Sequence, residues 1–276
     1  MPLGARERAA LVRLEQRQRL MIRDRLRDYA VTAWAGMGSW RDADVDRFVE
    51  RLLPRVQSGR ARVAQMTDAY IARMIETDPA GVADVSAPRG VPDDVVYRRP
   101  ALTVYSALSD GVPIAQAVAL AQRRLERLVA DDLMLAMRAQ ATHALSLMDG
   151  GLGGFRRTLT GRENCSLCAI ASTQRYTRGS LLPIHPGCDC GVEPLDPDRY
   201  YPQVIDQALL DSVHAQVEAL TGNASDRGAR DAGLGTLAED GLSEYMRHIA
   251  VREHGEFGAV LTWAHQAFTG PSDVPH

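Results

Sequence analysis

The chain contains only four cysteines, and all four lie between Gly161 and Cys190. Their pattern is Cys165-x2-Cys168, then sixteen residues, then His185-x2-Cys188-x-Cys190. Two thiolates of a Cys-x2-Cys turn can converge on one ion, and a second ligand pair from a distant turn can close a tetrahedron around it. Because thiolate and imidazole ligands favour Zn²⁺ over Mg²⁺ or Ca²⁺, the spacing predicts a zinc site.

Five side chains are candidates for the four ligand positions of this site: Cys165, Cys168, His185, Cys188 and Cys190. The first pair is Cys165 with Cys168, and the second is His185 with either later cysteine, or Cys188 with Cys190. Disulfides, which are rare in the cytosol, and reduced buried thiols without a metal are the alternatives. Since four protein ligands leave no open position for water, the predicted zinc is structural and not catalytic.

Other residues that could do chemistry do not form a catalytic set. Glu253-His254-Gly255-Glu256 places a histidine between carboxylates that could move protons, but it is not His-Glu-x-x-His, and we expect a structural or surface role. Asp131 and Asp132 are adjacent helix positions that diverge by about 100°, so we predict surface charge. We expect His143 and His214 to be packed or exposed without a functional role, and we predict that the protein is not an enzyme.

Helical periodicity dominates the first half of the chain. From Ala5 to about Trp34, an apolar stripe recurs at helical spacing: Leu11, Leu14, Met21, Ile22 and Tyr29. Ser39 is a predicted N-cap for a second helix from Trp40 to about Glu76, which Pro54 should end or kink. The four prolines and two glycines of Thr77–Pro100 predict a long loop.

A third helix is predicted from Pro113 to about Met148, followed by a glycine-rich boundary at Asp149–Gly154. The cysteine module comes next, then helix over Asp196–Gly222 and short strands around Phe257–Trp263. The expected fold class is α+β and mostly α, with long N-terminal amphipathic helices and a small zinc-stapled C-terminal module with short strands. The expected domains are a helical partner-binding region (1–78), a loop plus helical region (79–150), a cysteine and histidine module (151–270) and a loose tail (271–276).

Charge and hydropathy indicate whether the protein is expected to contact DNA or a membrane. The net charge is −3 and all 32 basic residues are arginine. Eight arginines stand against four acids in residues 1–28, so this arginine-rich helix could contact DNA, although mixed charge runs are usually solvated helix faces. No apolar run is long enough for a membrane span, and the N-terminus lacks the apolar region of a signal peptide. We expect a protein that is made in the cytoplasm and does not use a membrane.

The stretch Cys-x2-Cys … Leu-Pro-Ile-His-Pro-Gly-Cys-Asp-Cys resembles the signature of phage Mu F-like head morphogenesis proteins, the MuF-like minor capsid proteins. Pro183, His185, Pro186, Cys188 and Cys190 match the Pro-x-His-Pro-x-Cys-x-Cys motif, and Asp189 stands where many members have arginine. The stretches Arg55–Met74 and Val251–Gly270 resemble the branch in tailed phages of actinobacteria, with Ala259 replacing a proline of its Glu-His-Gly-Glu-x-Gly-Pro-Val-Leu-Thr ending.

The resemblance implies a minor capsid protein of the virion, inside the capsid near the portal vertex. Its implied partners are the portal protein and other head proteins, and its implied role is head assembly, DNA delivery or both. The alternative is a nucleic-acid-binding zinc module that contacts packaged DNA through the arginine-rich N-terminal helix. Four of the five cysteine and histidine candidates would hold Zn²⁺ in either case.

Overall fold

The structure is a computed structural model that divides into two compact units, Met1–Leu147 and Met148–His276. It describes residues 3–147, 154–159, 166–176, 188–195, 200–202, 204–212, 249–254 and 258–263. The chain is mostly helical with a few short strands, which confirms the mostly α fold class. Among the described residues, no helix combines the length and the apolar character that a membrane span requires.

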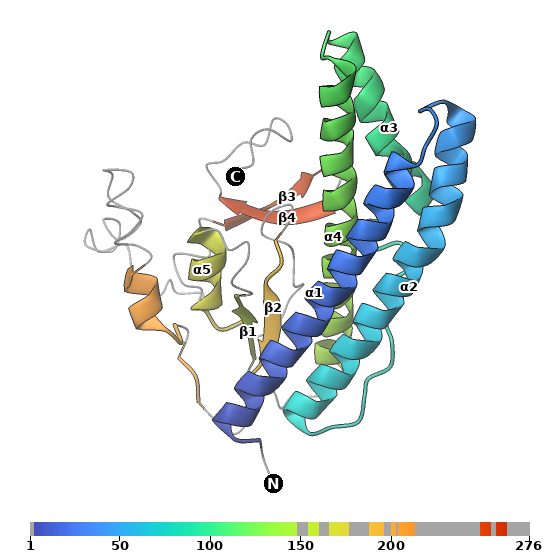
Figure 1. Cartoon of the computed structure of the whole chain (residues 1–276). Coiled ribbons are helices and arrows are strands. Elements are labelled where there is room, and N and C mark those ends of the chain that lie inside the picture. Colours follow the sequence, from blue (N-terminus) through green and yellow to red (C-terminus); the bar gives the residue numbers. More distant parts are fainter. Residues whose placement is uncertain are drawn as a thin grey trace. The chain divides into compact units, whose positions relative to one another are not determined.

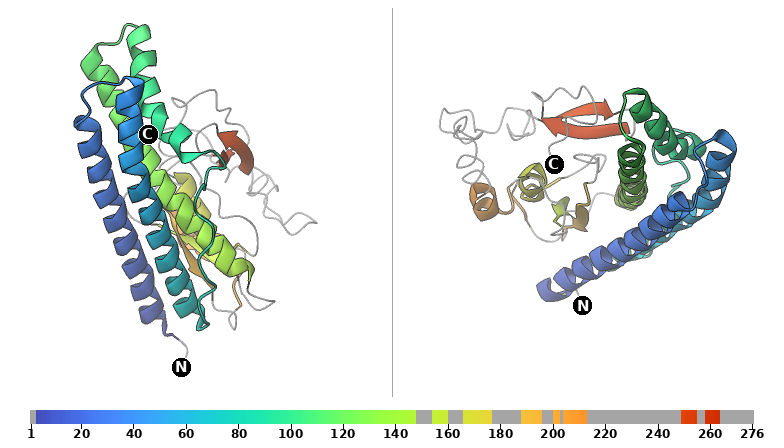
Figure 2. Two further views of the ribbon diagram at one scale, coloured as in Figure 1. Left: turned by 90° about the vertical axis from the view of Figure 1, so that its right-hand side faces the viewer. Right: turned by 45° about the horizontal axis from the view of Figure 1, so that its top comes forward.

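The first unit consists of four helices: α1 (Ala5–Ala35), α2 (Asp42–Ile75), α3 (Asp93–Ser109) and α4 (Ile114–Ser146). The helices α1 and α2 lie side by side and antiparallel (Figures 1 and 2). The Leu3 amide at the start of α1 donates to Glu76 Oε1 at the end of α2, at 2.8 Å. Because α4 packs against each of the other three helices, the core of this unit lies around α4.

The buried face of α1 differs from the predicted apolar stripe, because Leu14 and Met21 are exposed. The buried positions recur every three or four residues and include charged side chains: Glu15, Arg19, Arg23, Leu26, Ala30 and Trp34. Arg19 Nε donates a hydrogen bond to Glu15 Oε1 at 3.0 Å, so the two buried charges partly neutralise each other. The apolar pattern failed here because neighbouring helices, and not hydropathy alone, determine which face of α1 is covered.

The helix α2 continues without a break through Pro54, so the predicted end of the helix at this residue is wrong, and the predicted kink stays a prediction. Pro54 is exposed, and the backbone carbonyl four residues earlier can be hydrated where a buried one could not. Apolar residues of one face, among them Leu52 and Val56, are buried on both sides of the proline and hold the helix in place. Ser39 is not the N-cap, because Arg41 occupies that position and Ser39 Oγ contacts Asp44 instead.

The predicted loop of Thr77–Pro100 is shorter than expected, because α3 already begins at Asp93. Pro92 is the N-cap of α3. The carboxylates of Asp93 and Asp94 lie in the first turn, where they interact favourably with the positive end of the helix dipole. Pro100 lies inside α3 on its buried face. The prolines therefore mark the start and one interior position of a helix, and packing against α2 and α4 outweighs the proline penalty.

Asp131 and Asp132 are buried, so their predicted assignment as surface charge is wrong. Asp132 is 0% exposed and accepts hydrogen bonds from Arg60, from Arg89 Nε at 2.7 Å and from Tyr97 Oη at 2.7 Å. A carboxylate can be buried when it is fully paired and hydrogen-bonded in this way. The tertiary structure supplies those donors from α2, α3 and the segment before α3, and none of them is a helical neighbour of Asp132 in sequence.

The Arg60 guanidinium links α2 to the rest of this buried cluster. It donates two hydrogen bonds to the Asp93 carboxylate, each at 2.8 Å, and another to the Ser86 carbonyl at 2.7 Å. Burial alone would lower the pKa of Arg60, but the hydrogen bonds to Asp93 and the charge of Asp132 outweigh this effect and raise it. Arg60 therefore stays charged at every accessible pH.

The segment between α2 and α3 is held by side chains of the two long central helices. Asp68 of α2 accepts from the amides of Ala80 and Gly81 at 3.0 and 3.1 Å. Gln140 of α4 accepts from the Ala83 amide at 2.7 Å and donates to the Gly81 carbonyl at 2.8 Å. These bonds satisfy backbone groups that cover part of the core, so this connection is an ordered component of the first unit.

In the second unit, the described elements are β1 (Phe155–Thr158), α5 (Ser166–Ser172), β2 (Gly191–Pro194), β3 (Ile249–His254) and β4 (Gly258–Trp263). The strands form two antiparallel pairs, β1 with β2 and β3 with β4. Phe155 lies opposite Pro194, and Ile249 lies opposite Trp263. Of the predicted helix over 196–222, residues 207–212 are helical, but residues 200–202 and 204–206 are not, and Val204 instead forms a β-bridge with Gln174. The other residues of that stretch lie outside the described part.

Candidate metal centre

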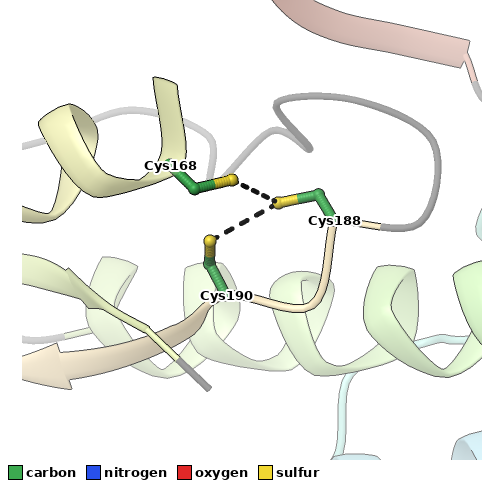
Figure 3. Close-up of side chains that lie close together, drawn as sticks. All are labelled: Cys168, Cys188 and Cys190. Carbon is green, nitrogen blue, oxygen red and sulfur yellow. Dashed lines mark hydrogen bonds between the residues drawn. The ribbon is translucent and has the colours of Figure 1, made fainter. Parts of the chain in front are cut away.

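Three cysteine thiols converge in the second unit. The Cys188 sulfur lies 3.8 Å from the Cys168 sulfur and 3.6 Å from the Cys190 sulfur. Figure 3 shows the side chains of Cys168 and Cys190 both directed at the sulfur of Cys188. All three sulfurs lie within 4.8 Å of one another, and each cysteine is at most 1% exposed.

The spacing of these sulfurs suits a tetrahedral metal ion. A zinc–sulfur bond of about 2.3 Å and a tetrahedral angle place neighbouring sulfurs about 3.8 Å apart. The two measured distances of 3.8 and 3.6 Å are close to this value. Three buried cysteines therefore lie close enough together to bind one metal ion, and thiolate ligands favour a soft or borderline ion such as Zn²⁺.

Two separate elements bring the thiols together. Cys168 belongs to the short helix α5, and Cys188 and Cys190 lie directly before β2. In an extended segment, side chains two residues apart point to the same side, so the Cys-Asp-Cys order places both thiols on one face. Pairing of β2 with β1 then fixes the position of this segment along β1. A cross-strand ion pair of Arg156 with Glu193, at 2.7 Å, supports this register.

A compact set of contacts connects α5 to β1. Tyr176, after α5, exchanges backbone hydrogen bonds with Phe155 at 2.7 and 2.8 Å, and the two rings stack at 5.4 Å. Tyr176 Oη donates to the Ala171 carbonyl at 3.0 Å, and burial raises the pKa of this phenol above its ordinary value. Gly154 has a φ of +106°, and a Cβ there would lie 2.4 Å from the Tyr176 carbonyl oxygen. Sequence reasoning missed the supporting roles of Gly154 and Tyr176, because nothing in the local pattern indicates that they meet.

The cysteines also form part of a small apolar core. Its buried members are Cys168, Ile170, Ala171, Cys188, Cys190 and Leu210. Leu210 comes from the helical residues 207–212, so the segment after β2 packs back over the thiols. A bound ion would be shielded from water on the sides that these residues cover.

The structure describes three of the five predicted ligands. It brings Cys168, Cys188 and Cys190 together, whereas Cys165 and His185 lie outside the described residues. Cys165 is three residues from Cys168, and His185 is three residues from Cys188. Either side chain could supply the fourth ligand of a tetrahedral site, and both remain predictions.

The other candidate residues of the sequence lie on separate elements or outside the described residues. Glu253 and His254 end β3, opposite Ala259 and Gly258 of β4, and the remaining residues of that motif lie outside the described part, as does His214. His143 lies in the last turn of α4 in the first unit. The prediction that these residues have no catalytic role stays a prediction.

The stretches that resemble MuF-like proteins fall on elements of both units. Arg55–Met74 lies within α2, and Val251–Gly270 covers parts of β3 and β4. Of the motif around His185, the described residues include Cys188 and Cys190 directly before β2. No protein-family model matches the chain, and neither curated proteins nor solved structures give a match. The resemblance therefore remains a prediction from the sequence.

Proposed function

We propose that this protein is a non-enzymatic component of a phage head, and that a structural zinc ion fastens its C-terminal module. The observation that carries the proposal is the convergence of three buried thiols, Cys168, Cys188 and Cys190, from two separate segments. Two of these cysteines belong to the motif that resembles MuF-like minor capsid proteins. The proposed location is the capsid interior near the portal vertex, with the portal protein and other head proteins as partners.

The physical reason for a zinc staple is the sparse core of this module. Its described apolar cluster is small, and it includes the three cysteines themselves. A structural zinc ion contributes on the order of 10 kcal/mol of apparent binding free energy, which can order a segment that hydrophobic burial alone cannot order. The metal would hold α5 against the segment that precedes β2, and it would supply no catalytic chemistry.

Elemental analysis of the purified protein tests the metal. Protein prepared under reducing conditions without chelator should contain about one zinc ion per chain, as one four-ligand site requires. Serine variants of Cys168, Cys188 and Cys190 should each lose most of this zinc, and Cys165→Ser and His185→Ala should identify the fourth ligand. His143→Ala is the matched control for the histidine variant, because it lies in the other unit. A wild-type protein without zinc would contradict the metal site.

Complementation of a phage that lacks the gene tests the head function separately. The wild-type chain should sediment with heads and co-purify with the portal protein, and Cys188→Ser should fail to do so. Infectious heads formed without the protein would contradict the head role while leaving the zinc site intact.

If the role of the protein is structural, phage growth should tolerate replacement of carboxylates in the cysteine and histidine module. Glu163→Gln and Glu256→Gln should support normal phage growth, because a staple needs no general base, whereas zinc hydrolases usually need one. If either variant abolished growth while zinc content and thermal stability stayed normal, the non-enzymatic proposal would be wrong.

A further inference from the structure

The exposed face of α2 carries a row of arginines. The residues are Arg47, Arg51, Arg55, Arg62 and Arg73, and all five are exposed. At 100° per residue, the five positions fall within about 80° of one another around the helix. Their span of 26 residues corresponds to about 39 Å along the axis. We call this surface the α2 arginine row.

Three of the five arginines in this row have no ion pair among the described residues. Arg47 pairs with Asp44, and the Arg55 guanidinium lies 5.4 Å from the centre of the Tyr29 ring. No ion pair of Arg51, Arg62 or Arg73 is found among the described residues. After the first turn of α2 the acids with exposed side chains are Glu50 and Asp46, and Asp46 pairs with Arg98 of α3. Arginines therefore outnumber acids along the exposed surface of this helix.

Helix stability does not explain this arrangement. Arg47, Arg51 and Arg55 are successive i,i+4 neighbours, and like charges at this spacing destabilise a helix. A solvated helix face would more commonly alternate arginine with glutamate. A repeated like charge with fewer acids than arginines therefore points to a polyanionic partner.

The side chains between the arginines indicate which polyanion fits. The exposed residues there are Glu50, Pro54, Gln57, Ser58, Gln65 and Ala69, and α2 has no exposed large hydrophobic residue. A protein interface generally has an apolar or aromatic centre, and single-stranded nucleic acid is usually held by aromatic side chains that stack on bases. The α2 arginine row offers neither, whereas a duplex presents a regular surface of phosphates without requiring base contacts.

The length of the row also suits a duplex. About 39 Å of helix exceeds one turn of B-DNA, which is about 34 Å. We propose that the α2 arginine row binds the phosphate backbone of double-stranded DNA without sequence specificity. This proposal does not depend on the zinc site or on the head function, and it assigns DNA contact to α2, where the sequence had pointed to the first helix.

The first helix provides the matched control. It also has exposed arginines, Arg6, Arg13, Arg17 and Arg25, but they share the exposed surface of α1 with the apolar Leu14 and Met21 and with the acids Glu7 and Asp28. A triple variant Arg6→Gln, Arg13→Gln, Arg17→Gln removes the same charge from α1 as Arg51→Gln, Arg62→Gln, Arg73→Gln removes from α2. The α2 triple variant changes only arginines without an ion pair among the described residues, and unchanged thermal melts of both variants would show that folding is preserved.

The experiment measures binding of the full-length protein to a fluorescein-labelled 30-base-pair duplex of random sequence by fluorescence anisotropy between 50 and 200 mM NaCl. The wild-type protein should bind, and the α2 triple variant should bind at least tenfold more weakly at 50 mM NaCl. Its slope of log K against log salt should be shallower by up to about 2.7, which is about 0.9 for each lost phosphate contact. The α1 triple variant should stay within threefold of wild type.

Four results would overturn the proposal. They are no duplex binding by the wild-type protein at 50 mM NaCl, equal losses in the two triple variants, tighter binding of a 30-nucleotide single strand than of the duplex, and equally effective competition by polyglutamate at the same charge concentration. Equal losses would indicate a general charge effect, and effective polyglutamate competition would indicate an acidic protein partner.

Discussion

At the scale of the residue, the Asp132 carboxylate is 0% exposed and lies among donors that come from three different parts of the first unit. Removing one partner from such a buried charged cluster is costly, because the remaining charge cannot return to water. Tyr97 is also 0% exposed, and burial together with the charge of Asp132 raises the pKa of its phenol well above 10. This pair makes the stability of the first unit sensitive to alkaline pH.

The pH dependence can be tested with Tyr97→Phe. In the wild-type protein, the unfolded phenol loses its proton above about pH 10 while the folded one keeps it, so the free energy of unfolding should fall as pH rises. The slope for this one group is at most about 1.4 kcal/mol per pH unit. Tyr97→Phe should remove this part of the slope and lower stability at pH 7 by about 1.5–3 kcal/mol through the lost bond to Asp132.

Urea unfolding followed by circular dichroism between pH 8 and 11 measures both effects. Tyr200→Phe is the control, since Tyr200 is 86% exposed, and it should keep the wild-type slope. An unchanged slope in Tyr97→Phe would show that the buried phenol does not titrate as its environment indicates.

The second residue-scale prediction concerns Gly154, which needs a left-handed backbone and space for the Tyr176 carbonyl. Gly154→Ala should destabilise the second unit by roughly 1–3 kcal/mol, because it adds backbone strain and a clash with main-chain atoms. Gly38→Ala is the control, because no atom lies within 4 Å of a Cβ at that position. Protease cleavage within 148–195 should increase only in Gly154→Ala, and equal resistance of the two variants would contradict the assigned role.

At the scale of the element, α2 shows how packing outweighs local propensity. Pro54 removes one backbone donor from the middle of a 34-residue helix, and its exposure leaves the affected carbonyl open to water. Apolar residues are buried on both sides of Pro54, and packing of α2 against its neighbouring helices holds the two halves in one helix. The proline therefore costs stability without changing the fold.

Replacing Pro54 with alanine should therefore stabilise the first unit. The variant restores a hydrogen bond to the Glu50 carbonyl and relieves the ring clash, and we expect a gain of roughly 1–3 kcal/mol in the free energy of unfolding. Ser58→Ala on the same exposed face should change stability by less than about 0.5 kcal/mol. Thermal melts compare the two, and a destabilised Pro54→Ala would indicate that the helix needs a bend at this position.

At the scale of the whole molecule, the chain has two compact units with different means of stabilisation. The first, Met1–Leu147, has long helices and a buried ion-pair cluster, and the second contains the converging thiols. The helical unit spans both segments that the sequence suggested as separate regions, 1–78 and 79–150. Arg60 of α2 and Asp132 of α4 are bonded partners, so a boundary at residue 78 would separate them.

Residues 1–147 should accordingly fold alone. The fragment should show helical circular dichroism and a cooperative thermal transition that a zinc chelator does not shift, because α1 to α4 bury their cores against one another. A chain of residues 79–276 should lose helical structure in 79–147, because Asp132 would be left without Arg60. An unfolded 1–147 fragment, or a chelator-sensitive transition in it, would contradict the independence of the two units.

The sequence by itself determined the mostly helical composition, the position of α4 and the gathering of the cysteines in one stretch, because periodicity and ligand spacing are local properties. It did not determine which face of α1 is buried, the continuity of α2 through Pro54, or the burial of Asp132. Those features depend on side chains far apart in the sequence: Asp132 is bonded to Arg60, which is 72 residues away. The cysteine spacing predicted that Cys168 and Cys188 share a site, but β-pairing and packing around α5 are what bring the two thiols together. Only the tertiary structure decides how much water and which partners surround a charged or ligating group, and this environment determines what the group can do.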